Sequence, residues 1–473
     1  MIRRTAVVTV AAVGALGMLS LVQPHSALAA GGSPTAYVAN DNDGTATPIA
    51  IATNTPGTPI TVGSCPQGLA ITPDAATAFV VNDCSGTVTA ITVSTNVTGT
   101  AITVGDAPVG MAIAPNGQTA YVANNNSNDL TPFTVATGVA GAPIPIGAAT
   151  GPRAIAITPN GATAYVADTN SGTVTPVTLA TDTVGTPITV GDDPEAIAVT
   201  PDGSTVYVAN AGSGSVTPIT VATNTAGTPI TVGPGPDGVA ISPDGAFAYV
   251  SNGGAASVTP ISIATNTALT PITVGTAPAG LAFTSDGKVL YVANVVSGTV
   301  TPITVATNTT GTPIPVGHNP IPLSITPDQA PVAALSVTVE PAGTPTRFDA
   351  SASTVAFGTI ARFKWTFGDG TTSTTSTPTT THTYGRAGTF TASVTETSSG
   401  GTSTTRVFTG QSVLRNGGPQ AVASASVIVA GVPVPSTGAG TVLRIGVLVM
   451  VLGTLTAVAS VWRRARGTPP TRP

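Results

Sequence analysis

The sequence repeats one phrase seven times. The string Ala-Tyr-Val-Ala-Asn, first at residues 36–40, returns with its aromatic residue at steps of 42, 42, 44, 42, 42 and 42 residues. These aromatic residues are Tyr37, Phe79, Tyr121, Tyr165, Tyr207, Tyr249 and Tyr291. A second phrase, ending in proline, recurs at the same intervals, at Pro66, Pro108, Pro152, Pro194, Pro236, Pro278 and Pro320. A fixed period in this range is typical of repeat architectures.

One copy shows what each repeat folds into. Residues 196–200 and 205–210 are β-prone runs joined by Pro201-Asp202-Gly203, and Asp-Gly between apolar runs is a strong hairpin signal. A third run covers 215–222 and a fourth covers 228–232. No segment has a helical apolar period. Four strands every 42 residues predict one blade of a β-propeller.

The two ends of the repeat region complement each other. The first copy begins at Tyr37 and lacks the strand that precedes it elsewhere, whereas the last copy contains only that strand, at 322–326. Gln329 replaces the usual turn glycine there, because no hairpin follows. We therefore predict an all-β, seven-bladed propeller over residues 31–328, in which residues 323–325 lie beside 37–39 and complete one blade.

Two series of prolines fall inside the predicted strands. The series in the fourth strand suits an outer edge, where a missing N–H costs least. It consists of Pro59, Pro143, Pro187, Pro229, Pro271 and Pro313. The other series falls in the third strand, which is not an edge, and it predicts a β-bulge there. It consists of Pro48, Pro132, Pro176, Pro218, Pro260 and Pro302.

The recurring phrases Tyr-Val-Ala-Asn, Val-Thr-Pro-Ile and Pro-Asp-Gly resemble the YVTN family of β-propeller repeats. That family occurs in surface-exposed proteins of bacteria and archaea. The resemblance implies a seven-bladed propeller and a cell-envelope setting, and it implies no single activity.

After Gln329 the period stops and a second domain is predicted at 329–430. Its phrases Phe363-Lys-Trp365-Thr-Phe367 and Gly368-Asp369-Gly370 resemble a PKD domain, an Ig-like β-sandwich. Trp365 and Phe367 are expected to point inward, with the glycines in a turn. His382 is read as a packing residue, with a ligand role as the alternative. The resemblance implies a spacer or a module that contacts carbohydrate or protein, and we assign no calcium to it.

The ends of the chain resemble export and anchoring signals. Arg3 and Arg4 precede an apolar run and Ala27-Leu28-Ala29, so residues 1–30 are predicted to be a signal peptide. Residues 441–462 are predicted to be one transmembrane helix, with the basic residues of 463–473 on the cytoplasmic side. The domains between them are then outside the cell.

The linker at 431–440 contains a sorting-like motif. The motif resembles the Leu-Pro-x-Thr-Gly signal of Gram-positive wall proteins, with valine in place of leucine, and consists of Val434, Pro435, Ser436, Thr437 and Gly438. A sortase thiolate would attack the Thr437 carbonyl and transfer the chain to a peptidoglycan amine. The alternative is a plain linker before a permanent membrane span.

Acidic residues dominate the repeat region. Residues 31–328 contain sixteen acidic side chains but only Arg153 and Lys288 as basic ones, which argues against a nucleic-acid partner. Ten of the acids are expected on one face, in loops that join strands four to one and two to three. They are Asp41, Asp43, Asp83, Asp106, Asp129, Asp168, Asp192, Asp193, Glu195 and Asp237.

This acidic face has two interpretations. It concentrates cations or a basic partner, with calcium as the candidate ion, or it is a solvated rim. No other cofactor is expected. The chain has two cysteines, Cys65 and Cys84, which are expected on the same face and predicted to form a disulfide.

The sequence predicts a binding protein rather than an enzyme. His318, Glu195 and Arg153 are expected on loops of different blades, without a recurring acid–base pair. The leading hypothesis is a cell-surface propeller on a PKD stalk that binds an envelope or extracellular protein or carbohydrate. The alternatives are a hydrolase or lyase, lactonase-like, with its site in the central funnel, and a passive coat component.

Overall fold

A computed structural model of the chain describes residues 34–356, 358–404, 406–407 and 415–431. The predicted signal peptide, sorting motif, membrane helix and basic tail lie outside these ranges, as does the linker apart from residue 431. Within the described ranges, no helix is both long and apolar enough to cross a membrane.

The repeats fold into seven antiparallel sheets, which confirms the predicted seven-bladed propeller. The innermost strands line the central channel and are β5 (Pro66–Ile71), β10 (Pro108–Ile113), β15 (Pro152–Ile157), β20 (Pro194–Val199), β25 (Pro236–Ile241), β30 (Pro278–Phe283) and β35 (Pro320–Ile325). The second strands carry the repeated aromatic residue and are β1 (Thr35–Asn40), β6 (Thr77–Asn82), β11 (Thr119–Asn124), β16 (Thr163–Asp168), β21 (Thr205–Asn210), β26 (Phe247–Asn252) and β31 (Val289–Asn294).

The outer half of each blade is less regular than the sequence suggests. The third strands are β2 (Thr45–Ala50), β7 (Thr87–Thr92), β12 (Asp129–Thr134), β17 (Thr173–Thr178), β22 (Ser215–Thr220), β27 (Ser257–Ser262) and β32 (Thr299–Thr304). The fourth strand is split into two short pieces that both pair with the third. These pieces are β3 (Thr55–Pro56) and β4 (Ile60–Thr61), β8 (Val97–Thr98) and β9 (Ile102–Thr103), β13 (Val139–Ala140) and β14 (Ile144–Pro145), β18 (Thr183–Val184) and β19 (Ile188–Thr189), β23 (Thr225–Ala226) and β24 (Ile230–Thr231), β28 (Thr267–Ala268) and β29 (Ile272–Thr273), and β33 (Thr309–Thr310) and β34 (Ile314–Pro315).

The irregularity predicted at the third-strand prolines lies in the facing fourth strand, where residues 57–59 stand opposite residues 47–48, and not in the third strand itself. Pro48 pairs with Tyr37 in an unbroken register between β1 and β2. The Pro48 carbonyl accepts a hydrogen bond from the Gly57 N–H at 2.7 Å, on the side of the fourth strand. Because both backbone groups of a residue in an antiparallel ladder face the same neighbour, the missing N–H of Pro48 also faces that side. The split in the fourth strand lies there, so no ladder bond is lost.

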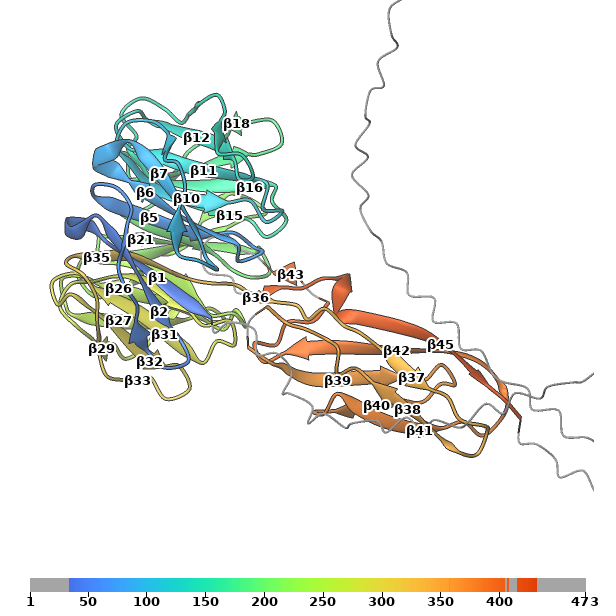
Figure 1. The fold of residues 1–473 in the computed structure, drawn as a ribbon. Helices are drawn as coiled ribbons and strands as arrows, with labels where there is room; N and C mark the ends of the chain where they lie inside the picture. Colours follow the sequence, from blue (N-terminus) through green and yellow to red (C-terminus); the bar gives the residue numbers. More distant parts are fainter. Residues whose placement is uncertain (1–33, 357, 405, 408–414, 432–473) are drawn as a thin grey trace, which may run out of the picture.

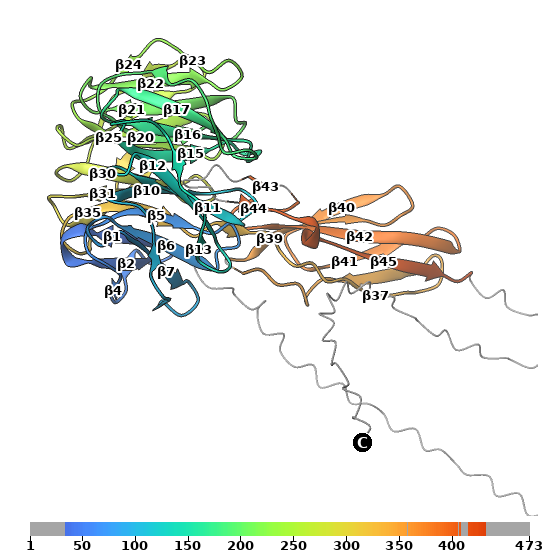
Figure 2. The same ribbon diagram turned by 90° about the horizontal axis from the view of Figure 1, so that it is seen from above.

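The two ends of the repeat region close the ring, as the sequence predicts. β35 pairs antiparallel with β1, with Ser324 opposite Tyr37 and Leu323 opposite Val38. The Thr326 N–H donates to the Thr35 carbonyl at 2.9 Å. The two strands lie side by side in both views (Figures 1 and 2). The seventh blade is therefore built from both ends of the propeller and held together without a covalent hairpin.

Neighbouring blades are held by apolar packing and by a recurring hydrogen bond. The Tyr207 hydroxyl donates to the Asn266 side-chain carbonyl in the next blade at 2.6 Å. Equivalent pairs are Tyr37–Asn96, Tyr165–Asn224, Tyr249–Asn308 and Tyr291–Asn54. Phe79 has no hydroxyl, and it packs against Phe133 of the next blade with ring centroids 5.2 Å apart.

The second domain is a sandwich of two sheets, as expected of a PKD domain. One sheet contains β37 (Ser336–Thr338), β38 (Pro345–Asp349) and β41 (Thr379–Thr383), and the other contains β40 (Thr372–Thr375), β39 (Ile360–Thr366), β42 (Gly388–Ser398) and β45 (Val422–Val429). Trp365 and Phe367 are buried between them. The His382 ring stacks on Phe367 with centroids 4.2 Å apart, and its Nε2–H donates to an Asp369 carboxylate oxygen 2.7 Å away. His382 therefore packs rather than standing free as a ligand.

A short segment joins the two domains. β36 (Asp328–Gln329) pairs with β44 (Arg415–Asn416), which pairs with β43 (Arg406–Val407), and β45 is preceded by η3 (Pro419–Ala421). The Gln329 amide donates to the Pro73 carbonyl at 2.9 Å, and the Ser398 hydroxyl donates to Asp328. Pro73 follows the far end of β5, so the sandwich joins the propeller at the end of the channel away from Pro66 (Figure 1).

Candidate functional site

Each innermost strand presents its second residue to the central channel. These seven residues line a cavity of about 150 Å³ and are Gln67, Val109, Arg153, Glu195, Asp237, Ala279 and Ile321. In all seven blades, the register between the innermost and second strands shifts next to this residue. Such bulges re-aim side chains and are frequent at the rims of active sites. The wall of the channel is therefore formed by the same repeat position in every blade, the residue after the recurring proline.

Three consecutive blades place charged side chains at this position. Arg153 on β15 forms an ion pair with Glu195 on β20, and both side chains are partly buried. Asp237 on β25 lines the same cavity. The expectation that Arg153 and Glu195 lie on separate loops is wrong, because each strand begins at its proline and the bulge directs the next residue into the channel.

Burial and charge shift the pKa values of the two carboxyl groups. Burial raises the pKa of Glu195 to about 6, Arg153 opposes that rise, and the negative charges of Asp237 and Asp193 add to it. Burial also raises the pKa of Asp237, against the effect of Arg153. At neutral pH Glu195 is therefore mostly ionised, and it is a stronger base than an ordinary glutamate.

Two further carboxyl groups stand at the mouth of the channel. Asp41 lies in η1 (Asp41–Asp43) and accepts a hydrogen bond from the Gln67 amide at 3.1 Å. Asp83 lies in η2 (Asp83–Ser85), where burial, followed by the charge of Asp41, raises its pKa while Arg153 lowers it. Arg153 is thus a single cation that faces several carboxylates.

Only some of the side chains assigned to the predicted acidic face are exposed on the surface. Asp43, Asp106, Asp192 and Asp193 are exposed, whereas Glu195 and Asp237 line the channel. Asp168 is wrongly placed on this face, because its side chain points into the blade and is 0% exposed. Asp129 accepts a hydrogen bond from the Asn124 amide at 2.6 Å. Among the residues that the structure describes, no three His, Cys, Asp or Glu side chains are grouped to hold a metal ion.

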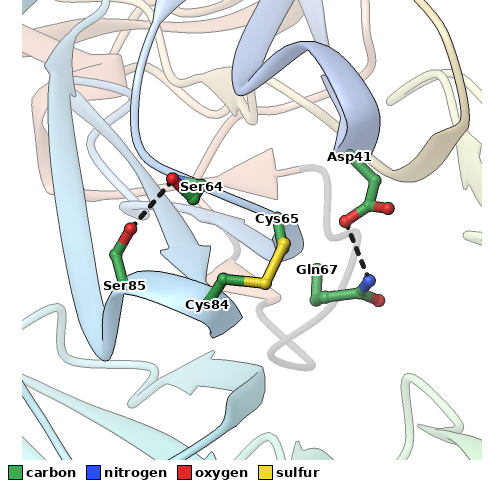
Figure 3. Close-up of a disulfide and its surroundings, with 6 residues drawn as sticks. All are labelled: Asp41, Ser64, Cys65, Gln67, Cys84 and Ser85. Atoms are coloured by element: carbon green, nitrogen blue, oxygen red, sulfur yellow. Dashed lines mark hydrogen bonds between the residues drawn. A yellow bond between two sulfur atoms is a disulfide. The ribbon is translucent and has the colours of Figure 1, made fainter.

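A disulfide joins Cys65 and Cys84 beside the mouth (Figure 3). Cys65 directly precedes β5, and Cys84 lies in η2. The Ser64 N–H also donates to the Ser85 hydroxyl at 2.9 Å, so two links hold the same pair of loops. Figure 3 shows Gln67 and Asp41 next to the bridge. The disulfide therefore fixes the loops that carry part of the channel mouth.

We expect a variant with both Cys65→Ser and Cys84→Ser to lose about 3 kcal/mol in free energy of unfolding, because the bridge closes a loop in the unfolded chain. The cysteines are 19 residues apart. Denaturant unfolding with and without reductant measures this loss. Reductant should lower the stability of the natural protein to that of the variant and leave the variant unchanged. Equal midpoints for both proteins without reductant would contradict the prediction.

The remaining basic side chains of the propeller lie elsewhere. The His318 ring is 2.8 Å from an Asp43 carboxylate oxygen, and its backbone N–H donates to the other oxygen at 2.7 Å. Lys288 pairs with Asp286 in the turn between β30 and β31. Neither lines the cavity, so Arg153 is the one cation among the described residues of the channel wall.

Sequence reasoning missed the channel cluster although a signal was present. When the seven copies are aligned on the recurring proline, the next residue is Gln, Val, Arg, Glu, Asp, Ala or Ile. The phrases around it repeat closely. A position that varies inside a regular repeat is not constrained by packing within the blade. Here the variable position is the one that faces the channel.

Comparison with known proteins agrees with this architecture. The model of a family described as "Lactonase, 7-bladed beta-propeller" matches residues 35–185 and 223–320, more than half of the chain, and a PKD domain model matches residues 328–411. Arg153 and Asp237 lie within the matched lactonase segments, and Glu195 lies between them. No curated protein matches.

Solved structures share the propeller fold at low identity. A protein of unknown function from Desulfotomaculum acetoxidans is 17% identical with a TM-score of 0.56, and the match covers 62% of this chain and 99% of that one. A candidate 6-phosphogluconolactonase from Bacteroides uniformis is 16% identical with a TM-score of 0.53, over 62% and 99%. Another from Bacteroides fragilis is 19% identical with a TM-score of 0.51, over 62% and 97%.

The family match corrects the expectation that this protein is not an enzyme. That expectation depended on separating Arg153 from Glu195, which the structure brings together. The chain belongs to the lactonase family of seven-bladed β-propellers.

Proposed function

We propose that the protein is a hydrolase that opens a lactone ring in the central channel. The observation that carries the proposal is the pairing of Arg153 with Glu195 inside a cavity, next to Asp237. The family match supports lactone chemistry, and two structures with the same fold are candidate 6-phosphogluconolactonases.

The cluster has the groups that ester hydrolysis needs. Glu195, with its pKa raised to about 6, takes a proton from water near neutral pH as the water oxygen attacks the lactone carbonyl carbon. The Arg153 guanidinium stabilises the negative charge that develops on the carbonyl oxygen. The bond between the carbonyl carbon and the ring oxygen then breaks, and the leaving oxygen takes the proton back from Glu195. The product is a hydroxy acid.

Asp237 acts on this reaction through Glu195. Its negative charge raises the pKa of Glu195, which keeps the carboxylate basic despite the neighbouring arginine. Asp237 is therefore a positioning residue in this proposal rather than a group that transfers a proton.

We expect Glu195→Gln to lower the rate of lactone hydrolysis by about 100-fold or more, because the amide cannot accept the proton. The natural protein should gain activity as the pH rises through about 6, and the variant should lose that part of the pH profile. Asp106→Asn is the matched control, because it removes one exposed carboxylate near the mouth without touching the cavity. Unchanged hydrolysis by Glu195→Gln would rule out this site.

We also propose that the protein works outside the cytoplasm, attached to the cell wall or the membrane. The signal-peptide-like N-terminus and the disulfide support this, since disulfides persist in oxidising compartments. Mass analysis of the mature C-terminus separates the two anchors. Wall attachment by a sortase leaves a chain that ends at Thr437, whereas a membrane anchor keeps residues 441–462.

A further inference from the structure

We infer that the channel takes a small uncharged lactone ring and rejects lactones that carry a phosphate. The inference rests on the hydrolase function proposed above and names the substrate class of that site. Three features carry it: the size of the cavity, the apolar part of its wall, and the charge around its mouth.

The size of the cavity limits the substrate to about one ring. Its volume is about 150 Å³. An engineered protein cavity of about this volume binds benzene. A single five- or six-membered lactone ring therefore fills the space beside Arg153, and any larger substituent has to extend into the mouth.

Apart from Gln67, whose amide donates to Asp41, the wall away from the charged cluster is apolar. Val109, Ala279 and Ile321 occupy the channel position in their blades, and Met111 and Leu281 also line the cavity. These side chains suit the carbon atoms of a ring and offer no hydrogen-bond donor. The reacting carbonyl is then directed to the opposite side, toward Arg153, which is the polar donor nearest Glu195.

The mouth has the wrong charge for a phosphate. Proteins bind phosphate with several Arg, Lys or backbone N–H donors. Here Arg153 faces Asp83 and is already paired with Glu195, and Asp41 adds a further negative charge beside Asp83. Lys288 lies in a distant turn and pairs with Asp286 at 3.0 Å. A dianionic substituent at the mouth would meet like charges without a compensating partner.

The test compares three lactones with the purified protein, after correction for spontaneous hydrolysis. Glucono-δ-lactone and 6-phosphoglucono-δ-lactone differ only in the phosphate, and δ-valerolactone is a small apolar ring. We expect the phosphate to lower kcat/KM by about 100-fold or more, because like charges brought together oppose binding strongly. δ-Valerolactone should be hydrolysed at least as well as glucono-δ-lactone.

A charge variant separates electrostatic rejection from steric rejection. Asp83→Asn should narrow the difference between the two gluconolactones several-fold, because it removes a negative charge beside Arg153. Asp182→Asn is the control. It removes the same charge from a turn in an outer strand pair, at a position where other blades carry Asn54, Asn96, Asn224, Asn266 and Asn308, and it should leave the difference unchanged.

The outcomes distinguish the two proposals. If the phosphorylated lactone is hydrolysed as well as or better than glucono-δ-lactone, the inference is wrong and the hydrolase function stands. If Asp83→Asn and Asp182→Asn have equal effects, the rejection does not come from the mouth and the inference is also wrong. If none of the three lactones is hydrolysed, the proposed function itself fails, and the inference falls with it.

Discussion

Replacing Ile325 with aspartate is expected to open the propeller ring. Ile325 is 2% exposed and lies opposite Ala36 in the ladder between β35 and β1. It packs in a cluster with Val38, Ile49 and Tyr291. An ionised carboxylate buried there without a partner costs several kcal/mol, which is comparable to the whole stability of many domains. The closing strand should detach, because no hairpin links it to β1.

Two variants make this expectation specific. Ile325→Val removes one methylene group and should cost only about 1 kcal/mol. Ile241→Asp places the same charge at the equivalent position of β25, which a hairpin joins to β26. Denaturant unfolding gives the stability of each variant, and limited proteolysis shows whether the chain is first cut near residues 35–40 and 320–325. Cleavage at these strands only in Ile325→Asp is expected. If Ile325→Asp unfolds at the same denaturant concentration as the natural protein, the closing ladder does not have the proposed role.

Replacing Asp168 with asparagine is expected to stabilise the protein and to remove a pH dependence. Asp168 is fully buried, and burial raises its pKa from 3.8 to about 7. One carboxylate oxygen accepts a hydrogen bond from the Thr175 hydroxyl at 2.5 Å, and the other has no partner. Asparagine occupies this position in the other blades, where, for example, the Asn210 amide donates to Thr217 at 2.9 Å.

The sign of the pH effect follows from the raised pKa. Between pH 4 and about 7 the folded protein keeps a proton on Asp168 that the unfolded chain has lost, so stability falls as the pH rises. The stability that the protonated carboxyl provides is complete below about pH 4 and is lost by the time the pH passes about 7. At about 1.4 kcal/mol per pH unit, the loss is about 4 kcal/mol. Asp168→Asn should be more stable than the natural protein by about this amount at pH 8.

The reverse substitution is the matched control. Asn210→Asp introduces a buried carboxyl at the equivalent position of another blade and should add the same loss of stability at high pH. Glu396 in the sandwich also has a pKa raised by burial, to about 7, so only differences between variants isolate Asp168. Stability curves from pH 4 to 8 check the prediction. Parallel curves for the natural protein and Asp168→Asn would show that this carboxyl does not titrate in that range.

The architecture could be predicted from the sequence because the repeat leaves few alternatives. Seven aromatic residues at a fixed interval define the blades, and the missing first strand at Tyr37 matches the spare strand after Pro320. Hydrophobic pairing then fixes the register, since a shift of one residue would turn Val38 and Leu323 away from the core.

The channel cluster was harder to predict, because the variable residue after each recurring proline shows that this position differs between blades but not where its side chain points. Arg153, Glu195 and Asp237 are far apart in the sequence, and only the curvature of the ring brings them together. The position of a bulge depends on backbone geometry that repeat patterns do not encode, so the strands seemed to begin after these residues. The burial of Asp168 was also unexpected, because it ends a strand at the asparagine position of the repeated phrase and aspartates are rarely fully buried.

The strand that closes the ring runs almost directly into β36, in the segment that joins the propeller to the sandwich. Only Thr326 and Pro327 separate β35 from β36. Tension applied from the C-terminal side would therefore reach the closing strand β35, which no hairpin joins to β1. The Gln329 amide bound to Pro73 and the Ser398 hydroxyl bound to Asp328 intercept that load before it reaches Ile325. We therefore expect these contacts to protect the closing ladder of the propeller against pulling from the C-terminal side.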